Sequence, residues 1–111
     1  MAYDDQLADR VRAALPDRDD VSERKMFGSL AFMVGDHMAC AARKDGSLLA
    51  RVGVDGMDAA LAEPHVAPMQ MGERTMKGYV FVAPEGVADD AALQGWVDRC
   101  VAFVEALPPK G

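Results

Sequence analysis

The segment from residue 24 to residue 42 concentrates side chains that could bind a soft metal ion. It contains Met26, Met33, His37, Met38 and Cys40. Thioether, thiolate and imidazole groups together favour Cu(I). Methionine is also a pliable filler of cores and interfaces and needs no metal there. On the strand register given below, His37 points away from the face that carries Met33 and Met38. Packing therefore explains the cluster better, and we expect no metal site.

Nucleophilic catalysis is also poorly supported. A reactive cysteine needs a nearby base and a cation or helix terminus that lowers its pKa. Cys100 instead lies in the middle of a predicted helix, on its apolar side, and His65 follows Pro64 in a predicted loop. The glycine-rich phosphate-binding loops and the serine nucleophile elbow are absent from the sequence. We expect a non-enzymatic protein without a cofactor, with Cys40 and Cys100 as buried, reduced thiols.

Five basic residues occur at predicted strand ends or in the loop GERTMKG. If they converge on one rim, they could hold an anion or meet an acidic patch on a partner. The alternative is that they are solvated and paired with the many carboxylates. Arg51 is the most interesting member because it lies on an otherwise apolar strand face. The five are Arg24, Lys25, Arg51, Arg74 and Lys77, and the proposed binding set is Lys25, Arg51, Arg74 and Lys77.

Hydrophobic spacing and turn residues predict the elements that position these groups. Apolar residues recur at helical spacing in three segments, and short alternating segments between turn residues favour strands. Asp4 and Asp5 suit the start of the first helix, Asp55 the start of the second, and Asp89 or Asp90 the start of the third. The predicted helices span 4–15, 55–63 and about 89–107, and the predicted strands span about 21–27, 30–34, 37–44, 47–52, 66–71 and 78–83.

The turns at Gly35-Asp36 and Asp45-Gly46 predict the register of the central strands. If both are two-residue hairpin loops, residues directly opposite one another share a face. The predicted core face carries Leu30, Phe32, Val34, His37, Ala39, Ala41, Arg43, Leu48, Ala50 and Val52. The other face carries Ala31, Met33, Met38, Cys40, Ala42, Leu49 and Arg51. This second face is too apolar for water, so Met33, Met38, Cys40 and Leu49 predict a self-association surface and a homodimer.

The order of elements predicts an α+β protein, with three helices on an antiparallel sheet of five to six strands, in a single domain over residues 1–111. The sequence has 18 acidic and 12 basic residues and a formal charge of −6. Direct nucleic-acid binding is disfavoured because it usually needs a basic face. The absence of a long apolar run or a signal-like N-terminus leads us to expect a cytoplasmic protein with no membrane partner.

Three segments resemble a known family. RKMFGSLAFMVGDHM (24–38), LLARVG (48–53) and MKGYVFVAPEGV (76–87) are similar to the TfoX N-terminal domain family, named for the TfoX/Sxy regulators of natural competence. The resemblance implies helices packed on an antiparallel sheet in a secretion-chaperone-like, two-layer arrangement. Full-length regulators also have a C-terminal helix-hairpin-helix domain and act as coactivators with the catabolite activator protein. We expect this chain to be the N-terminal domain alone, with a possible protein partner in transcription.

Overall fold

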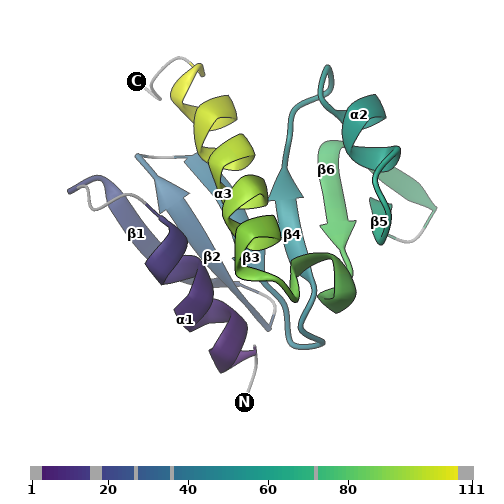
Figure 1. Cartoon of the computed structure of the whole chain (residues 1–111). Coiled ribbons are helices and arrows are strands. Elements are labelled where there is room, and N and C mark those ends of the chain that lie inside the picture. Colours follow the sequence, from purple (N-terminus) through teal and green to yellow (C-terminus); the bar gives the residue numbers. More distant parts are fainter. Residues whose placement is uncertain (1–3, 16–18, 27, 36, 72, 108–111) are drawn as a thin grey trace.

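One antiparallel sheet of six strands forms the framework of the protein (Figure 1). The computed structural model describes residues 4–15, 19–26, 28–35, 37–71 and 73–107. The strand order is β1-β2-β3-β4-β6-β5. The strands are β1 (Val21–Met26), β2 (Ser29–Val34), β3 (His37–Ala42), β4 (Leu48–Arg51), β5 (Val66–Met71) and β6 (Arg74–Val82).

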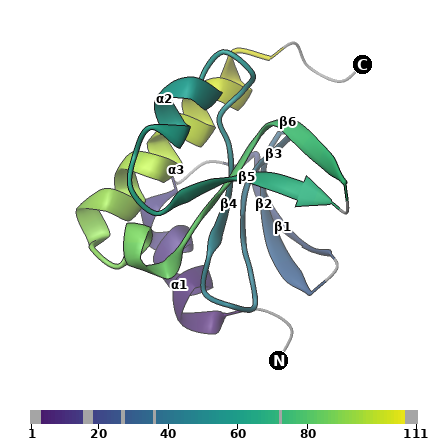
Figure 2. The ribbon, with the colours of Figure 1, turned by 90° about the vertical axis from the view of Figure 1, so that its right-hand side faces the viewer.

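All three α-helices lie on the same side of this sheet (Figure 2). They are α1 (Asp5–Ala14), α2 (Met57–Leu61) and α3 (Asp90–Glu105), and a short 3₁₀-helix, η1 (Pro84–Val87), precedes α3. The predicted α+β class is confirmed, with an N-terminal, a short central and a long C-terminal helix. Among the described residues, no helix combines the length and apolar character needed to cross a membrane.

The helix starts show which capping expectations hold. The side chain of Asp4 accepts a hydrogen bond from the backbone N–H of Leu7 at 2.9 Å and so satisfies one of the free donors of α1. Asp55 was expected to cap α2, but that expectation is wrong. Gly56 occupies the N-cap position without a side-chain bond, and a backbone bond from Gly56 N–H to Gly53 O closes the preceding turn.

The main core lies between the sheet and the helices. Phe32 and Leu48 are fully buried there and pack with Val11 of α1 and Val97 of α3. Most charged residues of both helices are exposed on the other side, as expected for amphipathic helices that cover one sheet face.

A β-bulge changes the register predicted for β3. Met33 pairs with Met38 and Val34 with His37 as expected, but Phe32 pairs with Cys40, so Ala39 is an extra residue. Because side chains alternate along a strand, one extra residue inverts every position after it. The assignment of Cys40 and Ala42 to the methionine face is therefore wrong, and both pack in the main core. Ala41, expected in the main core, lies on the other face.

The turn between β3 and β4 is also longer than predicted. The N–H of Arg43 donates to Ser47 O at 3.0 Å, so residues 44–46 form a three-residue loop. Gly46 has φ +84°, which fits a type I turn that ends in a left-handed glycine. The extra residue in this turn shifts the register by one position in the opposite sense to the bulge at Ala39, so the two shifts cancel in β4. Leu48 and Ala50 consequently face the main core, and Leu49 faces the other side, as predicted.

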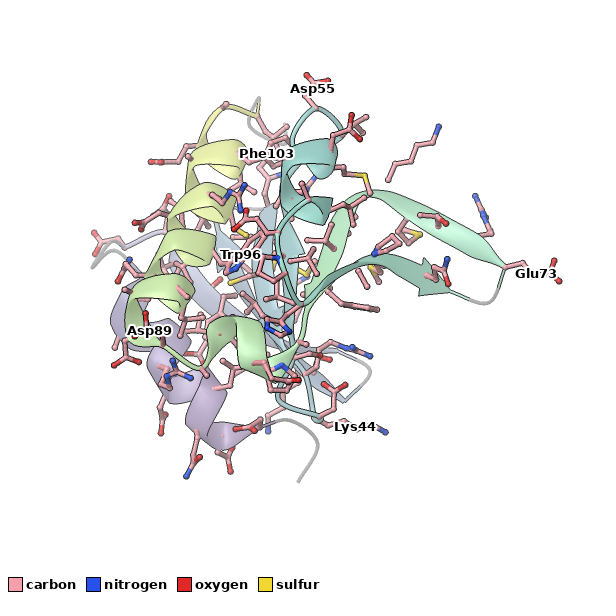
Figure 3. The ribbon with its side chains drawn as sticks, turned by 45° about the vertical axis from the view of Figure 1, so that its right-hand side comes forward. Lys44, Asp55, Glu73, Asp89, Trp96 and Phe103 are labelled. Carbon is pink, nitrogen blue, oxygen red and sulfur yellow. The ribbon has the colours of Figure 1, made fainter. Side chains whose placement is uncertain are left out.

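The last hairpin is longer than expected. The segment predicted as the loop GERTMKG is mostly strand, because β6 begins at Arg74 and runs to Val82. Gly78, within this strand, has φ +89°. Figure 3 shows the resulting hairpin reaching away from the body of the protein, with Glu73 at its tip.

The ion pair between α1 and β1 gives a testable pH dependence. Arg12 binds both carboxylate oxygens of Glu23, at 2.6 and 2.9 Å, and these hydrogen bonds lower the pKa of Glu23. A lowered folded-state pKa stabilises the fold above the unfolded value of about 4.3, and this stabilisation is lost as the pH falls through the folded value. Since both side chains are more than a third exposed, we expect Glu23→Gln to cost only about 0.2–1 kcal/mol at neutral pH.

Urea unfolding at neutral and acidic pH measures this cost. The difference between wild type and Glu23→Gln should disappear once the carboxylate is protonated in both folded and unfolded chains. Glu73→Gln, in the exposed hairpin turn, is the control and should not change the free energy of unfolding at either pH. A cost that persisted unchanged in strong acid would show that Glu23 acts through packing instead.

Candidate functional site

The sheet face opposite the helices carries a second apolar cluster. Ala31, Ala41 and Leu49 are buried at its centre, with exposed fractions of 0, 2 and 9%. Five larger, partly buried side chains surround them: Met33, Met38, Met69, Tyr79 and Phe81. All eight residues come from strands, and no helix contributes to the cluster. We call these eight residues the open face.

The helices leave this cluster uncovered. In Figure 2 the helices lie on one side, and β1, β2, β5 and β6 extend toward the other side. Small alanines at the centre and long methionines around them leave an adaptable apolar surface, because the methionine side chain is unbranched and flexible. Of the four residues predicted to form a self-association surface, Met33, Met38 and Leu49 lie on this face. Cys40 does not, because of the bulge.

Two arginines lie against the aromatic members of the open face. The guanidinium of Arg43 is 3.9 Å from the ring centre of Phe81, and that of Arg51 is 5.6 Å from the ring centre of Tyr79. These distances are within the range of cation–π attraction. Arg43, expected in the main core, instead lies against Phe81 because the bulge inverts this part of the chain.

The side chain of Arg51 also binds a backbone carbonyl of β3 beside the bulge. The ladder between β3 and β4 extends from Ala42 to Cys40 and stops there. Nη1 of Arg51 lies 3.4 Å from the carbonyl oxygen of Met38 and donates to it. Its guanidinium also lies 5.5 Å from the ring centre of Phe103. Arg51 is thus held by backbone and ring contacts.

The predicted basic rim does not form. Lys25 lies on β1, four strands away from β6, which is about 19 Å at the usual strand spacing. Arg74 lies five residues along β6 from Tyr79, the partner of Arg51, or about 16 Å. Only Lys77 remains near Arg51 in sequence register. The expectation that these residues converge is wrong, because Lys25 lies in the other half of the sheet and Arg74 lies at the far end of β6.

Both cysteines belong to the main core and form no disulfide. Burial raises the pKa of Cys40 well above its usual value, and the neighbouring Cys100 raises it further. Burial also raises the pKa of Cys100 to about 12, although a backbone hydrogen bond from Arg51 and the charge of Arg99 act in the other direction. Raised pKa values leave little thiolate, so neither side chain suits nucleophilic chemistry.

We expect both thiols to be unreactive in the folded protein. Thiol titration at mildly alkaline pH should detect neither Cys40 nor Cys100 until denaturant is added, and then both. Lys44→Cys places a thiol in the exposed β3–β4 turn and should react at once without denaturant. Prompt reaction of a native cysteine would contradict the burial described above.

A hollow of about 510 Å³ on the helix side was not expected from the sequence. Its walls include Trp96 and Arg99 of α3, and His65 from the loop after α2. Figure 3 shows Trp96 between α3 and the α2–β5 region. Arg99 pairs with Glu63 and lies 4.5 Å from the ring centre of Trp96. The guanidinium of Arg99 is therefore already bound within the protein, by Glu63 and by the ring of Trp96.

His65 was expected to be a turn or solvated residue. It is exposed and has φ +66°, a left-handed conformation that is uncommon outside glycine. Its carbonyl accepts a hydrogen bond from Ala83 N–H at 2.8 Å, which fixes the loop beside β6. No group of three or more histidine, cysteine or acidic residues within the described ranges could hold a metal ion.

The family model described as the TfoX N-terminal domain matches residues 5–104. The chain belongs to the TfoX N-terminal domain family. No curated protein and no solved structure gives a significant match.

Several residues of the three segments that resemble the TfoX N-terminal domain family have structural roles here. The matched segments contain Gly53 and Gly78, whose backbones cross closely. Gly78 O accepts hydrogen bonds from the N–H groups of Val52 and Gly53, at 2.9 and 3.0 Å. Phe32 fills the main core, whereas Met33 belongs to the open face. Met26 pairs with Ser29 at the β1–β2 turn, and Phe27 lies outside the described residues. These segments of the chain therefore contribute to the core, to a turn and to the open face.

Proposed function

We propose that this TfoX N-terminal domain is a non-enzymatic protein-interaction module whose open face binds another protein chain. The observation that carries the proposal is the second apolar cluster, which is built from strands and has no helix over it. Apolar patches left uncovered on a protein surface commonly mark interaction sites.

The family suggests the setting in which this binding is used. Its members are named for competence regulators, so we propose a role in transcriptional regulation through a protein partner. The charge of −6 supports contact with proteins rather than direct contact with DNA. A small anionic ligand at the basic residues was the alternative, but it loses its geometric basis because Lys25 and Arg74 lie far from Arg51.

A homodimer is one way to cover the open face. Size-exclusion chromatography with light scattering over a wide dilution series tests it. If the open face mediates the dimer, Phe81→Ala should shift the equilibrium toward monomer. The control is Val54→Ala, which removes an exposed apolar side chain, 63% accessible, outside the open face. A wild-type protein that is monomeric at every concentration would remove the homodimer and leave a different protein as the occupant.

A further inference from the structure

The strands of this acidic protein are basic. Across the six strands the only carboxylate belongs to Glu23, whereas five residues are basic: Arg24, Lys25, Arg51, Arg74 and Lys77. Glu23 lies opposite Phe32, on the helix side, and is bound by Arg12 of α1. Because the whole chain has a formal charge of −6, its negative charge is concentrated on the helices and loops. Figure 3 shows two examples, Asp55 beside α2 and Asp89 at the start of α3.

Three arginines accompany the open face. Arg24 lies opposite Ala31, so its side chain shares the face of that buried alanine. Arg43 and Arg51 lie against Phe81 and Tyr79. Arg43 has an acidic neighbour, Asp45, at 3.6 Å. Arg24 is exposed and makes no ion pair with any other described residue. The open face therefore combines apolar contact area with cations that still have hydrogen-bond donors to offer.

This combination discriminates between possible occupants. A symmetric pair of open faces would bring the arginines of two copies together. The strands supply no carboxylate on this face, and the nearby Asp45, in the β3–β4 turn, already pairs with Arg43 of its own copy. An acidic segment would instead give each guanidinium a carboxylate, which is the stronger and more directional kind of hydrogen bond. Its apolar residues would cover the flexible methionines, which can adapt to a partner's shape.

We infer that the open face binds an acidic, apolar segment of a different protein rather than a second copy of this chain. This inference rests on the proposed function and specifies its partner by chemistry. The segment places apolar side chains over Met33, Met38 and Met69, and carboxylates beside Arg24 and Arg51. Such complementarity also predicts association that weakens as salt screens the charges.

Selection from a displayed library of random peptides, with the whole chain as bait, tests the inference. We expect the bound peptides to be enriched in aspartate and glutamate together with large apolar residues. Phe81→Ala should weaken their binding because it removes part of the open face. Arg24→Glu should weaken it about tenfold or more, since it replaces a charge-assisted hydrogen bond by repulsion.

Lys25→Glu is the matched control. Lys25 is the next residue on the same strand and is also exposed, but it lies opposite Leu30 on the helix side. The charge change is identical, so the wild-type affinity should be largely retained. Equal losses in Arg24→Glu and Lys25→Glu would show that only overall charge matters and would overturn the inference.

The remaining outcomes separate the inference from the proposed function. Neutral peptides that Phe81→Ala weakens and Arg24→Glu does not would overturn the acidic partner and keep the open face as a binding surface. Failure to select any peptide that depends on Phe81 would count against both. A DNA duplex that binds wild type and not Arg24→Glu would assign the face to nucleic acid and would likewise overturn the inference.

Discussion

Phe32→Ala is expected to destabilise the fold by about 3–5 kcal/mol, the usual cost of truncating a fully buried phenylalanine. Phe32 has no exposed surface and packs between the sheet and the helices. Its removal leaves a cavity that the surrounding strands and α3 can fill only in part. Since small domains are stable by about 5–15 kcal/mol, this change consumes a large share of the total. Urea unfolding followed by circular dichroism measures the loss.

Phe81→Ala is the matched comparison on the other face of the sheet. Phe81 is partly buried on the open face, so we expect a smaller loss of about 1–2 kcal/mol. The two variants delete the same side chain from opposite faces. If both variants lost the same free energy of unfolding, Phe81 would be as deeply buried as Phe32. That result would contradict the partial exposure of Phe81 on the open face. The expected inequality also makes Phe81→Ala a folded variant suited to the binding experiments.

Gly53→Ala is expected to cost about 2–5 kcal/mol, from left-handed backbone strain and from overpacking together. Gly53 has φ +81°, and a Cβ built there would lie 2.3 Å from a ring carbon of Phe103. Phe103 is partly buried and packs against the main core, so displacing its ring costs packing. Thermal and urea unfolding of the variant measure the cost.

Gly35→Ala separates the two contributions to this cost. Gly35 also has a positive φ, +63°, but a Cβ there would meet no atom within 4 Å. We therefore expect only the backbone term, about 1–2 kcal/mol. If Gly35→Ala and Gly53→Ala were equally destabilising, the contact with Phe103 would carry no energy and the close packing at Gly53 would be wrong.

The sequence predicted the class of fold because its signals are local. Asp4 caps α1, the apolar spacing of α3 places Leu93, Val97 and Cys100 inward, and glycine-containing turns separate β2, β3 and β4. These features depend on neighbours within a few residues. The positions of the helices and most strands could therefore be predicted without knowledge of long-range contacts.

Register depends on single residues, and there the prediction failed in one strand. The extra residue at Ala39 and the longer turn at residues 44–46 each shift the pairing by one position, in opposite senses. The two errors cancel at Leu49 but leave Cys40 and Ala41 inverted. Nothing in the sequence HMACAA marks a bulge, since alanine suits either face. Beside the bulge, the guanidinium of Arg51, thirteen residues away in sequence, donates to the carbonyl oxygen of Met38.

The site was predicted in part. Met33, Met38 and Leu49 were placed on the second apolar face from alternation alone, whereas Met69, Tyr79 and Phe81 come from distant strands that only the topology brings alongside. The strand order β4-β6-β5 could not be predicted, because β5 follows β4 in the chain and yet β6, not β5, pairs with β4. For the same reason, the basic residues were expected on one rim and are in fact spread across the sheet.

The most direct test of the open face as a binding surface is nuclear magnetic resonance of methionine methyl groups during titration with the selected peptides. Met33, Met38 and Met69 lie on the open face, and Met57 of α2 packs against the main core on the other side of the sheet. We predict that the signals of the first three shift or broaden while that of Met57 stays unchanged. A shift of Met57 without changes at Met33, Met38 and Met69 would place binding elsewhere and contradict the proposed function.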